Sequence, residues 1–460
     1  MAKGGVRGTA PVRRFGGIAA AALAASLVAS LLASCGTKRS VELAAQADAA
    51  AEAAGPGGIG NGPGVTATEV KVGFVDLKTE KLQKTLGIKL PPSGDTEAQI
   101  AAIAAEVNDS GGIAGRKMVP VVRPFEALTD SQANEEKLCK AFTEDDEVFA
   151  VVLQGQFQAT VRSCYAGAET LMLDTTAFPL DQKSFESYDP YLWQPSYPEY
   201  GLLNAAMVAD LGDSGFFDDA KLGVVGIDND QNRRVYDEQV EPALQRAGVE
   251  PEDVRWIDGS NSSTLQTGQD QAVLAFKGAG VDRLFVVGGS RLASFMMATA
   301  QKQEYYPRFA LSTWDSPDFG IRNYPKSMVG AQGVSVMPGF DVGDEQYPFP
   351  ATDAERDCVK VLESAGEKFT QRAAVRNQLM WCDASFLLRD AFADSDGPVS
   401  AEEFQTGVAD LGGDYESAAI YASGFTKGAF TGGAGYRRMV YGPKCNCMQL
   451  EGEVREFPSS

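Results

Sequence analysis

The chain has 460 residues, of which 44% are hydrophobic, and this is enough for two or three globular domains with sizeable cores. Its net charge is −21, and a surface this acidic repels phosphate backbones, so we do not expect a nucleic acid partner. The chain has no histidine, which excludes Ser-His-Asp and Cys-His catalysis and every zinc site that needs an imidazole.

The first 34 residues have the layout of a secretory signal peptide, because four basic residues and no acidic one precede an apolar stretch over 18–32. Residues 32–35, LASC, resemble the bacterial lipobox. The resemblance implies that the Cys35 thiol receives a diacylglyceryl group and becomes the new N-terminus. We therefore expect an extracytoplasmic protein, lipid-anchored on a bacterial cell membrane. The alternative is an uncleaved transmembrane anchor, since the run approaches the roughly 18–20 apolar residues that a span needs.

Residues 35–64 are rich in Ala and then in Gly and Pro, and this composition predicts a flexible tether. The tether contains a G-x-G-x-x-G string at Gly55, Gly57 and Gly60. Dinucleotide binding needs that string directly after a strand, whereas a low-complexity linker precedes it here. We therefore expect no cofactor.

From residue 65 onward, apolar strands alternate with helices, which predicts parallel sheets joined by right-handed crossovers. Thr96 and Asp130 are expected to cap the first two helices, and Pro120 indicates an edge strand or a bulge. The expected strands are 69–77, 117–125, 148–154, 170–176, 221–227, 253–258, 282–289 and 308–314. The expected helices are 96–109, 130–142, 158–168, 199–212, 233–248, 265–280 and 290–303. The two series repeat one architecture, and two such lobes enclose a cleft that suits a small ligand.

One segment carries a family resemblance. Residues 106–122, EVNDSGGIAGRKMVPVV, resemble the helix-turn-strand signature of type I periplasmic solute-binding proteins, the family of the leucine/isoleucine/valine receptors. Gly111 and Gly112 would end the helix in a left-handed turn, and Gly115 would allow the reversal into the strand. Three further segments match in the same order along the chain, and the last of them contains the aromatic-Asp-Ala pattern of Trp381, Asp383 and Ala384.

The resemblance implies an α/β fold of two doubly wound lobes of parallel sheet, with flanking helices and a three-strand hinge. The three crossings between the lobes would fall near Gln194, Gly333 and Ser423. Lobe 1 would contain 65–194 plus 333–422, and lobe 2 would contain 195–332 plus 423–460. A ligand would close the lobes about the hinge.

Six cysteines remain beside Cys35, an even number that indicates pairing in an oxidising compartment. The sequence allows fifteen connectivities. The resemblance implies a disulfide in the region of Cys139 and Cys164, which lie on consecutive helices. Cys358 and Cys382 lie on two successive late helices, and Cys445 and Cys447 form a C-x-C that would close a tight loop. The alternative is that some of the six are buried free thiols.

In the family, the loop after the third strand holds a ligand carboxylate with backbone N–H groups and a hydroxyl. Here Gln156, Phe157 and Gln158 replace the usual serine, which puts a simple amino-acid ligand in doubt. Thr175 and Thr176 match the family's small hydroxylated turn, or they only cap a helix.

In lobe 2, Asp228 follows a strand, and Trp314 and Asp315 match the segment that often offers an acid to a ligand ammonium. Trp314 is alternatively a core residue. Asp228 also begins a pattern like an EF-hand loop, but the sixth and twelfth positions are wrong, so we expect no metal. The long loop 78–95 either borders the cleft or is a surface insertion.

Together these features predict a lipid-anchored, extracytoplasmic solute-binding component of an ABC importer. It would be a monomer that captures a small polar molecule, such as an amino acid, an amide or a related compound, and then docks on a membrane permease. No catalysis is expected. One alternative is a ligand sensor of the same fold that acts on a signalling partner. The other is an anchored hydrolase, although no G-x-S-x-G or comparable motif supports it.

Overall fold

The computed structural model describes residues 60–457, with positions 93 and 396 left out. The expected signal peptide, the acylation site Cys35 and most of the expected tether lie outside the described residues. Among the helices that are described, none combines the length and the apolar character that a membrane span requires.

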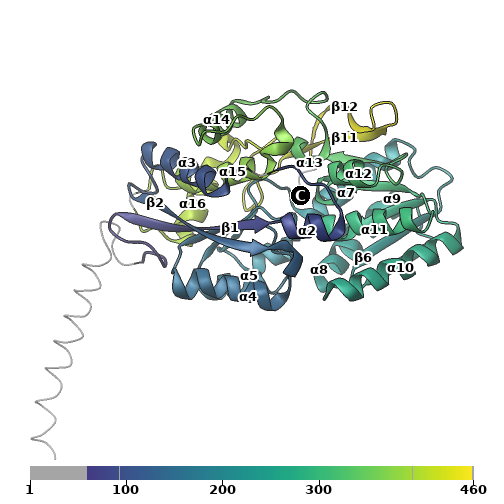
Figure 1. Cartoon of the computed structure of the whole chain (residues 1–460), viewed down its shortest axis with the longest axis horizontal. Helices are drawn as coiled ribbons and strands as arrows, with labels where there is room; N and C mark the ends of the chain where they lie inside the picture. Colours follow the sequence, from purple (N-terminus) through teal and green to yellow (C-terminus); the bar gives the residue numbers. More distant parts are fainter. Residues whose placement is uncertain (1–59, 93, 396, 458–460) are drawn as a thin grey trace, which may run out of the picture. The chain divides into compact units, whose positions relative to one another are not determined.

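The described strands form two sheets (Figure 1). The first sheet is parallel and has the order β2-β1-β3-β4-β5. Its strands are β1 (Glu69–Lys78), β2 (Lys117–Glu126), β3 (Ala150–Leu153), β4 (Leu171–Asp174) and β5 (Leu192–Trp193). We call this sheet and the helices packed on it lobe 1. These helices are α3 (Thr96–Asp109), α4 (Gln132–Lys140), α5 (Val161–Gly167), α6 (Gln182–Ser187), α14 (Asp353–Glu363), α15 (Arg376–Asp390) and α16 (Ala401–Leu411).

The second sheet has the order β12-β11-β10-β9-β8-β6-β7. Its parallel part contains β6 (Leu222–Ile227), β7 (Asp253–Ile257), β8 (Arg283–Val287), β9 (Arg308–Ser312) and β10 (Gln332–Ser335). An antiparallel hairpin of β11 (Gly435–Gly442) and β12 (Cys447–Glu456) extends one edge. We call this sheet and its helices lobe 2. These helices are α7 (Tyr200–Asp213), α8 (Asp230–Val235), α9 (Glu241–Arg246), α10 (Ser262–Ala279), α11 (Ser290–Lys302) and α12 (Pro317–Asn323).

The expected α/β class with parallel sheets is confirmed, and its cause is visible in burial. Every residue of β3 and β4 is buried, as is usual for parallel strands covered by helices on both faces. Pro120 lies on β2, which is an edge strand as predicted. At the turn after α3, Gly112 has φ +73°, and a Cβ there would lie 2.1 Å from the Arg116 carbonyl oxygen, so the turn requires glycine.

Both predicted helix caps are wrong by one residue. Asp95, not Thr96, caps α3, because its carboxylate accepts the Ala98 N–H at 3.1 Å. Ser131, not Asp130, caps α4. In both cases the capping residue has the extended backbone that directs its side chain back to the first turn.

The three chain segments that pass between the lobes lie side by side. The Gln194 N–H donates to the Phe430 carbonyl at 2.9 Å, which joins the first crossing to the third. The Tyr421 N–H donates to the Val336 carbonyl at 3.2 Å, which joins the third crossing to the second. The second crossing begins after β10, which contains Gly333. The residue-level division into lobes stays a prediction.

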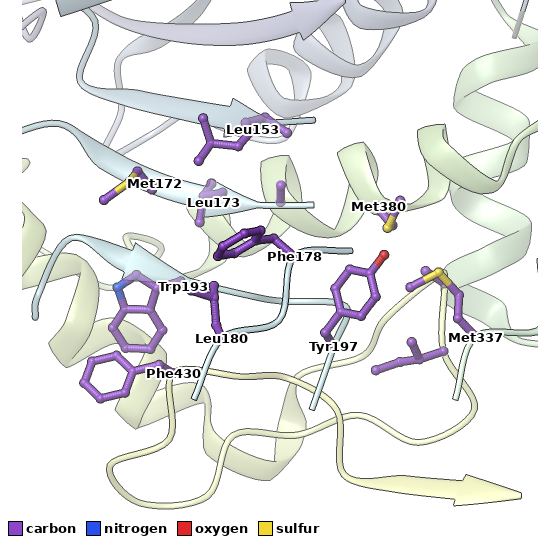
Figure 2. Close-up of a cluster of buried hydrophobic side chains, with 14 of the residues drawn as sticks. Leu153, Met172, Leu173, Phe178, Leu180, Trp193, Tyr197, Met337, Met380 and Phe430 are labelled. Atoms are coloured by element: carbon purple, nitrogen blue, oxygen red, sulfur yellow. The ribbon is translucent and has the colours of Figure 1, made fainter. Parts of the chain in front are cut away.

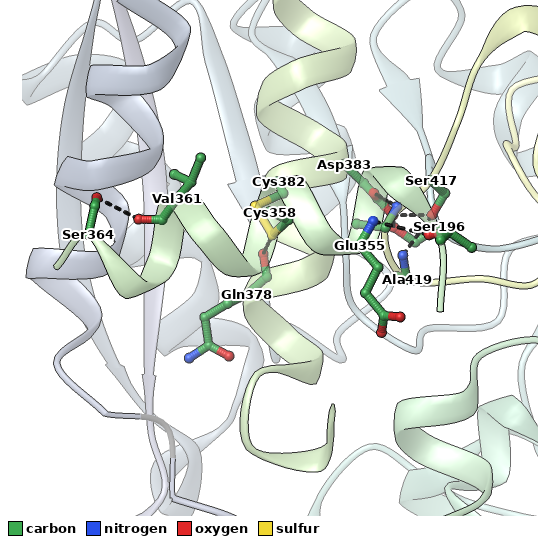
Figure 3. The surroundings of a disulfide bond; sticks show 12 residues. Ser196, Glu355, Cys358, Val361, Ser364, Gln378, Cys382, Asp383, Ser417 and Ala419 are labelled. Carbon is green, nitrogen blue, oxygen red and sulfur yellow. Dashed lines mark hydrogen bonds between the residues drawn. A yellow bond between two sulfur atoms is a disulfide. The ribbon is translucent and has the colours of Figure 1, made fainter. Parts of the chain in front are cut away.

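Asp383 on α15 fastens two of these crossings (Figure 3). Its carboxylate accepts hydrogen bonds from Ser196 Oγ (2.7 Å) in the first crossing and from Ser417 Oγ (2.5 Å) and Ala418 N (2.6 Å) before the third. Asp383 is buried, and burial raises its pKa to about 6. The aromatic-Asp-Ala pattern thus anchors the hinge region to lobe 1.

The largest hydrophobic core continues from the first sheet into the crossings (Figure 2). Leu153 and Met172 come from the sheet, Tyr197 and Met337 from the crossings, and Met380 from α15. Lobe 1 and the hinge therefore share one packed interior.

Three disulfides are present among the described cysteines. Cys139–Cys164 joins α4 to α5, Cys358–Cys382 joins α14 to α15 (Figure 3), and Cys445–Cys447 lies in the turn between β11 and β12. All six described cysteines are paired, so the alternative of buried free thiols is wrong.

Candidate functional site: the cleft between the lobes

The carboxyl ends of strands from both sheets line a shared cavity of about 170 Å³, which we call the first cavity. Leu77, Gln154 and Thr175 stand at the ends of β1, β3 and β4 in lobe 1. Ser290 and Ser316 follow β8 and β9 in lobe 2. Both sheets thus present their ligand-favouring edges to one space.

A second cavity of about 470 Å³ adjoins the first, because the two share several lining residues, including Phe157 and Arg376. One wall is the segment 79–92, which contains α2 (Glu80–Leu86). The opposite wall comes from α10, α11 and α12 of lobe 2. A third cavity of about 210 Å³ lies between the loop after β3 and the loop after β6, and Phe157 lines all three.

Five of the predicted ligand residues line these cavities. Thr175 and Thr176 line the first cavity, Gln158 and Asp228 the third, and Phe157 all three. Neither threonine caps a helix, since Asp181 caps the next one, α6. The hydroxyl of Thr175 donates to the Leu153 carbonyl at 2.7 Å, whereas the buried hydroxyl of Thr176 has no hydrogen-bond partner among the described residues.

Asp228 is the most exposed of these five, with 47% of its side chain accessible. Its carboxylate pairs with Arg233 at 2.6 Å. In the part of the chain that the structure describes, no group of three or more acidic or cysteine side chains is arranged to hold a metal ion.

Three predicted ligand residues do not line these cavities. Trp314 is fully buried, and its ring packs against Tyr197 and Tyr200 with centroid distances of 4.6 and 5.6 Å. The prediction that it faces the cleft is wrong, because its indole packs on these two tyrosines in the core. Asp315 is held by a capping box, accepting from Ser312 N at 2.7 Å and Ser312 Oγ at 3.0 Å.

Burial raises the pKa of Asp315 to about 7, and its carboxylate does not reach the cavities. It therefore does not serve as the acid expected for a ligand ammonium. Gln156 is also fully buried and lines none of the three cavities. The neighbouring residues Phe157 and Gln158 of the same loop do line the cavities.

Two arginines that the sequence analysis missed also line the cleft. Arg376, at the start of α15, lines the first and second cavities, and its Nη1 lies 3.2 Å from Asp318. Arg291, at the start of α11, lines the second and third cavities and lies 3.9 Å from Asp130. No local motif marks either residue, and only their positions in the folded chain identify them.

A buried ion pair on the core side of the cleft fixes the loops after β3 and β4. Arg162 donates to Asp174 Oδ2 from Nε at 3.1 Å and from Nη2 at 2.8 Å, and both side chains are inaccessible to solvent. Arg162 Nη1 also donates to the Gln158 carbonyl at 3.0 Å, and Asp174 Oδ1 accepts the Thr176 N–H at 2.9 Å. One ion pair therefore ties the loop after β3 to the loop after β4.

Glu135 on α4 is a second buried support. Its carboxylate accepts the Gln158 N–H at 3.1 and 3.2 Å. Burial, reinforced by the neighbouring Asp130, raises the pKa of Glu135 to about 9. Burial therefore favours the protonated form of Glu135 over the charged form.

Solved structures similar to this chain are substrate-binding proteins. A possible leucine/isoleucine/valine-binding protein from Rhodopirellula baltica has a TM-score of 0.57 and 13% identity, covering 84% of this chain and 97% of its own. The branched-chain amino acid transporter substrate-binding protein LivJ from Streptococcus pneumoniae, in complex with isoleucine, has a TM-score of 0.54 and 13% identity, covering 85% and 100%. The chain has the type I periplasmic binding protein fold. A fatty acid ABC transporter substrate-binding protein from Thermomonospora curvata shares this type I fold, with a TM-score of 0.57, 16% identity and coverage of 88% and 96%. No family model and no curated protein match the sequence.

In this type I fold, the segment 79–92 reaches across the cleft from lobe 1 to lobe 2. The Lys89 N–H donates to Asn323 Oδ1 at 2.8 Å, and Asn323 Nδ2 donates to the Lys89 carbonyl at 3.2 Å. The lobes are further joined by Arg234 and Asp181 at 2.6 Å. The long loop after the first strand therefore borders the cleft and is not a separate surface insertion.

Proposed function

We propose that this protein is the extracytoplasmic solute-binding component of an ABC importer and that it captures a small polar or amphipathic molecule between its lobes. The observation that carries this proposal is the shared lining of the first cavity by strand ends from both sheets. The similar solved structures are named as substrate-binding proteins, which supports the same role here. Capture of a solute requires no covalent chemistry, so the chain acts as a binder and not as an enzyme.

Binding would close the lobes around the three side-by-side crossings, and the closed form would dock on a membrane permease as a monomer. The boundaries 65–194 plus 333–422 and 195–332 plus 423–460 are our proposal for the two moving bodies. The lipobox-like LASC supports a diacylglyceryl anchor at Cys35, and the tether to residue 64 would let the anchored body reach its permease.

Among the predicted ligand residues, we propose that Phe157, Thr176 and Gln158 contact the solute, because they line the cavities and stand at the ends of β3 and β4. The Thr176 hydroxyl has no hydrogen-bond partner among the described residues, so a ligand oxygen that reached it would supply one. The proposed solute is a small polar or amphipathic molecule, and amino acids, amides and related compounds are the first classes to screen.

A thermal-shift screen of purified protein against a metabolite library tests the proposal. One chemical class should raise Tm progressively with its concentration, because a ligand that binds only the folded state stabilises it by mass action. Thr176→Val and Phe157→Ala should weaken this shift, whereas Thr406→Val, on the exposed face of α16, should leave it unchanged. The proposal fails if no class shifts Tm, or if both cleft variants respond to the hit as the unmodified protein does.

The anchor has its own test. In an expressing bacterium, the full chain should partition with membranes and carry an acyl mass on the peptide that begins at Cys35. Cys35→Ser should remain as an unacylated precursor. Equal acylation of both forms would reject Cys35 as the attachment site.

A further inference from the structure

The first cavity has an unusual set of polar groups for an amino-acid site. Among the residues that the structure describes, Arg376 is the only charged side chain that lines it, and no acidic side chain does. The Nε2 of Gln154 and the Oγ1 of Thr176 also belong to residues that line it, and both atoms are buried without a hydrogen-bond partner among the described residues. Gln154 is 5% exposed and Thr176 is 2% exposed. Since buried polar atoms are almost always paired, these groups indicate a ligand with hydrogen-bond acceptors.

Arg376 has donors to spare. Its bonds to Asp318 and to the Gly339 carbonyl both use Nη1, and its Nε and Nη2 make no hydrogen bond with the described residues. Asp318 also accepts from Arg322 at 2.7 Å, so one carboxylate is shared by two guanidinium groups. The pair of arginines therefore keeps a net positive charge, which favours an anion beside Arg376.

The second cavity supplies an apolar wall. Leu82, Leu86, Ile88 and Leu90 line it from the segment 79–92, and Leu265, Phe295 and Phe319 line it from lobe 2. Helix α2 has no buried residue, and Leu86 is 45% exposed, so Leu82 and Leu86 are not part of the core. Three other members, Ile88, Leu265 and Phe319, are buried and form the base of this wall. Apolar side chains gathered on an exposed wall mark a binding surface.

Because the two cavities share lining residues that include Arg376, a single elongated ligand can occupy both. Resting on the proposed solute-binding function, we infer that the solute is a carboxylic acid with an apolar chain and without an α-amino group. Its carboxylate binds Arg376, Gln154 and Thr176 in the first cavity, and its chain lies against the leucines of 79–92 in the second. The described lining of the first cavity offers no acid to pair an α-ammonium group, which sets this ligand class apart from amino acids.

Titration calorimetry with straight-chain carboxylates of six, eight and ten carbons, each below its micellar concentration, tests this inference. Each added methylene should tighten binding by about fourfold, because burying one methylene contributes about 0.8 kcal/mol. Decanol, decylamine and 2-aminodecanoate should bind at least about tenfold more weakly than decanoate, since they lose a charge-assisted hydrogen bond or bring an unpaired ammonium.

The variants separate the two halves of the site. Arg376→Met should weaken decanoate binding by roughly 10- to 150-fold, the range for a hydrogen bond to a charged group. Arg356→Met is the matched control, because Arg356 pairs with Asp353 on the exposed face of α14, lines none of the three cavities, and its loss should leave decanoate binding unchanged. Leu86→Ser on exposed α2 should reduce the gain per methylene without changing the preference for a carboxylate.

The outcomes separate this inference from the proposed function. If 2-aminodecanoate or a small amino acid binds more tightly than decanoate, or if Arg376→Met binds decanoate normally, the ligand class is wrong while solute binding stands. If neither the carboxylates nor any member of the metabolite library binds, both proposals fail. A shared fourfold step per methylene in the Arg376→Met and unmodified proteins, with lower affinity for the variant, supports the inference.

Discussion

Removal of the buried Arg162 beneath the cleft loops should lower the free energy of unfolding far more than removal of an exposed arginine. Arg162→Met leaves Asp174 fully buried, with the Thr176 N–H as its remaining hydrogen-bond donor among the contacts described. Breaking a buried ion pair in this way typically lowers the free energy of unfolding by about 3–5 kcal/mol, because an uncompensated charge stays in the interior. The same change also removes the bond to the Gln158 carbonyl and the stacking of the guanidinium on Phe178 at 4.1 Å.

Urea unfolding of the unmodified protein, Arg162→Met, Asp174→Asn and the double variant gives the coupling between the two side chains. Arg255→Met is the matched control, because Arg255 pairs with Asp253 at 2.7 Å while 45% of its side chain is exposed. Exposed pairs contribute only about 0–1 kcal/mol, so the control should shift the midpoint little. If Arg162→Met costs no more than Arg255→Met, or if the double variant is as unstable as the two single changes summed, the ion pair does not hold these loops together.

Three further predictions concern pH, cross-links and the segment across the cleft. The raised pKa of Glu135, about 9 against an ordinary 4.5, means that the folded state binds more protons between those values. The free energy of unfolding should therefore fall with rising pH, by up to about 1.4 kcal/mol per pH unit, and Glu135→Gln should remove that component. If the free energies of unfolding of the unmodified protein and of Glu135→Gln change in parallel between pH 5, 6.5 and 8, this prediction is wrong. Replacing Cys358 and Cys382 with serines should lower the free energy of unfolding by about 3.5 kcal/mol, because it opens a loop with a separation of 24 residues. The same change at Cys445 and Cys447, which are separated by 2, should lower it by only about 1 kcal/mol. Equal losses for the two pairs in urea unfolding would show that loop entropy is not the cause. Asn323→Ala should speed hydrogen exchange at the Lys89 amide, since it removes the acceptor of that N–H, and an unchanged exchange rate would show that this contact does not order the segment.

The alternation of strands and helices was readable because most strands are buried on both faces and therefore form short, continuous apolar runs. β3 and β4 show this pattern, and the expected ranges 148–154 and 170–176 contain them. The hairpin of β11 and β12 gave no such signal, because most residues of β12 are exposed and polar. Backbone hydrogen bonds hold these strands at the sheet edge, and such bonds do not require the apolar side chains from which strands are predicted.

The candidate site was readable only where it depends on strand ends. Thr175 and Thr176 follow directly from their place after β4, and the cavities include both. Trp314 has an equivalent place after β9, but the packing of Tyr197 and Tyr200 decides that its ring faces the core. Arg376 is about 200 residues distant in sequence from Thr176, so only the folded chain brings them to one cavity.

The carboxylate of Asp383 receives donors both from the first crossing and from the segment that leads into the third. Any sliding of one crossing past the other would pull several short bonds away from a single buried anion, while a swing about an axis through that point would leave them intact. If the lobes close as proposed, these hydrogen bonds therefore favour a rotation about Asp383 over a sliding motion.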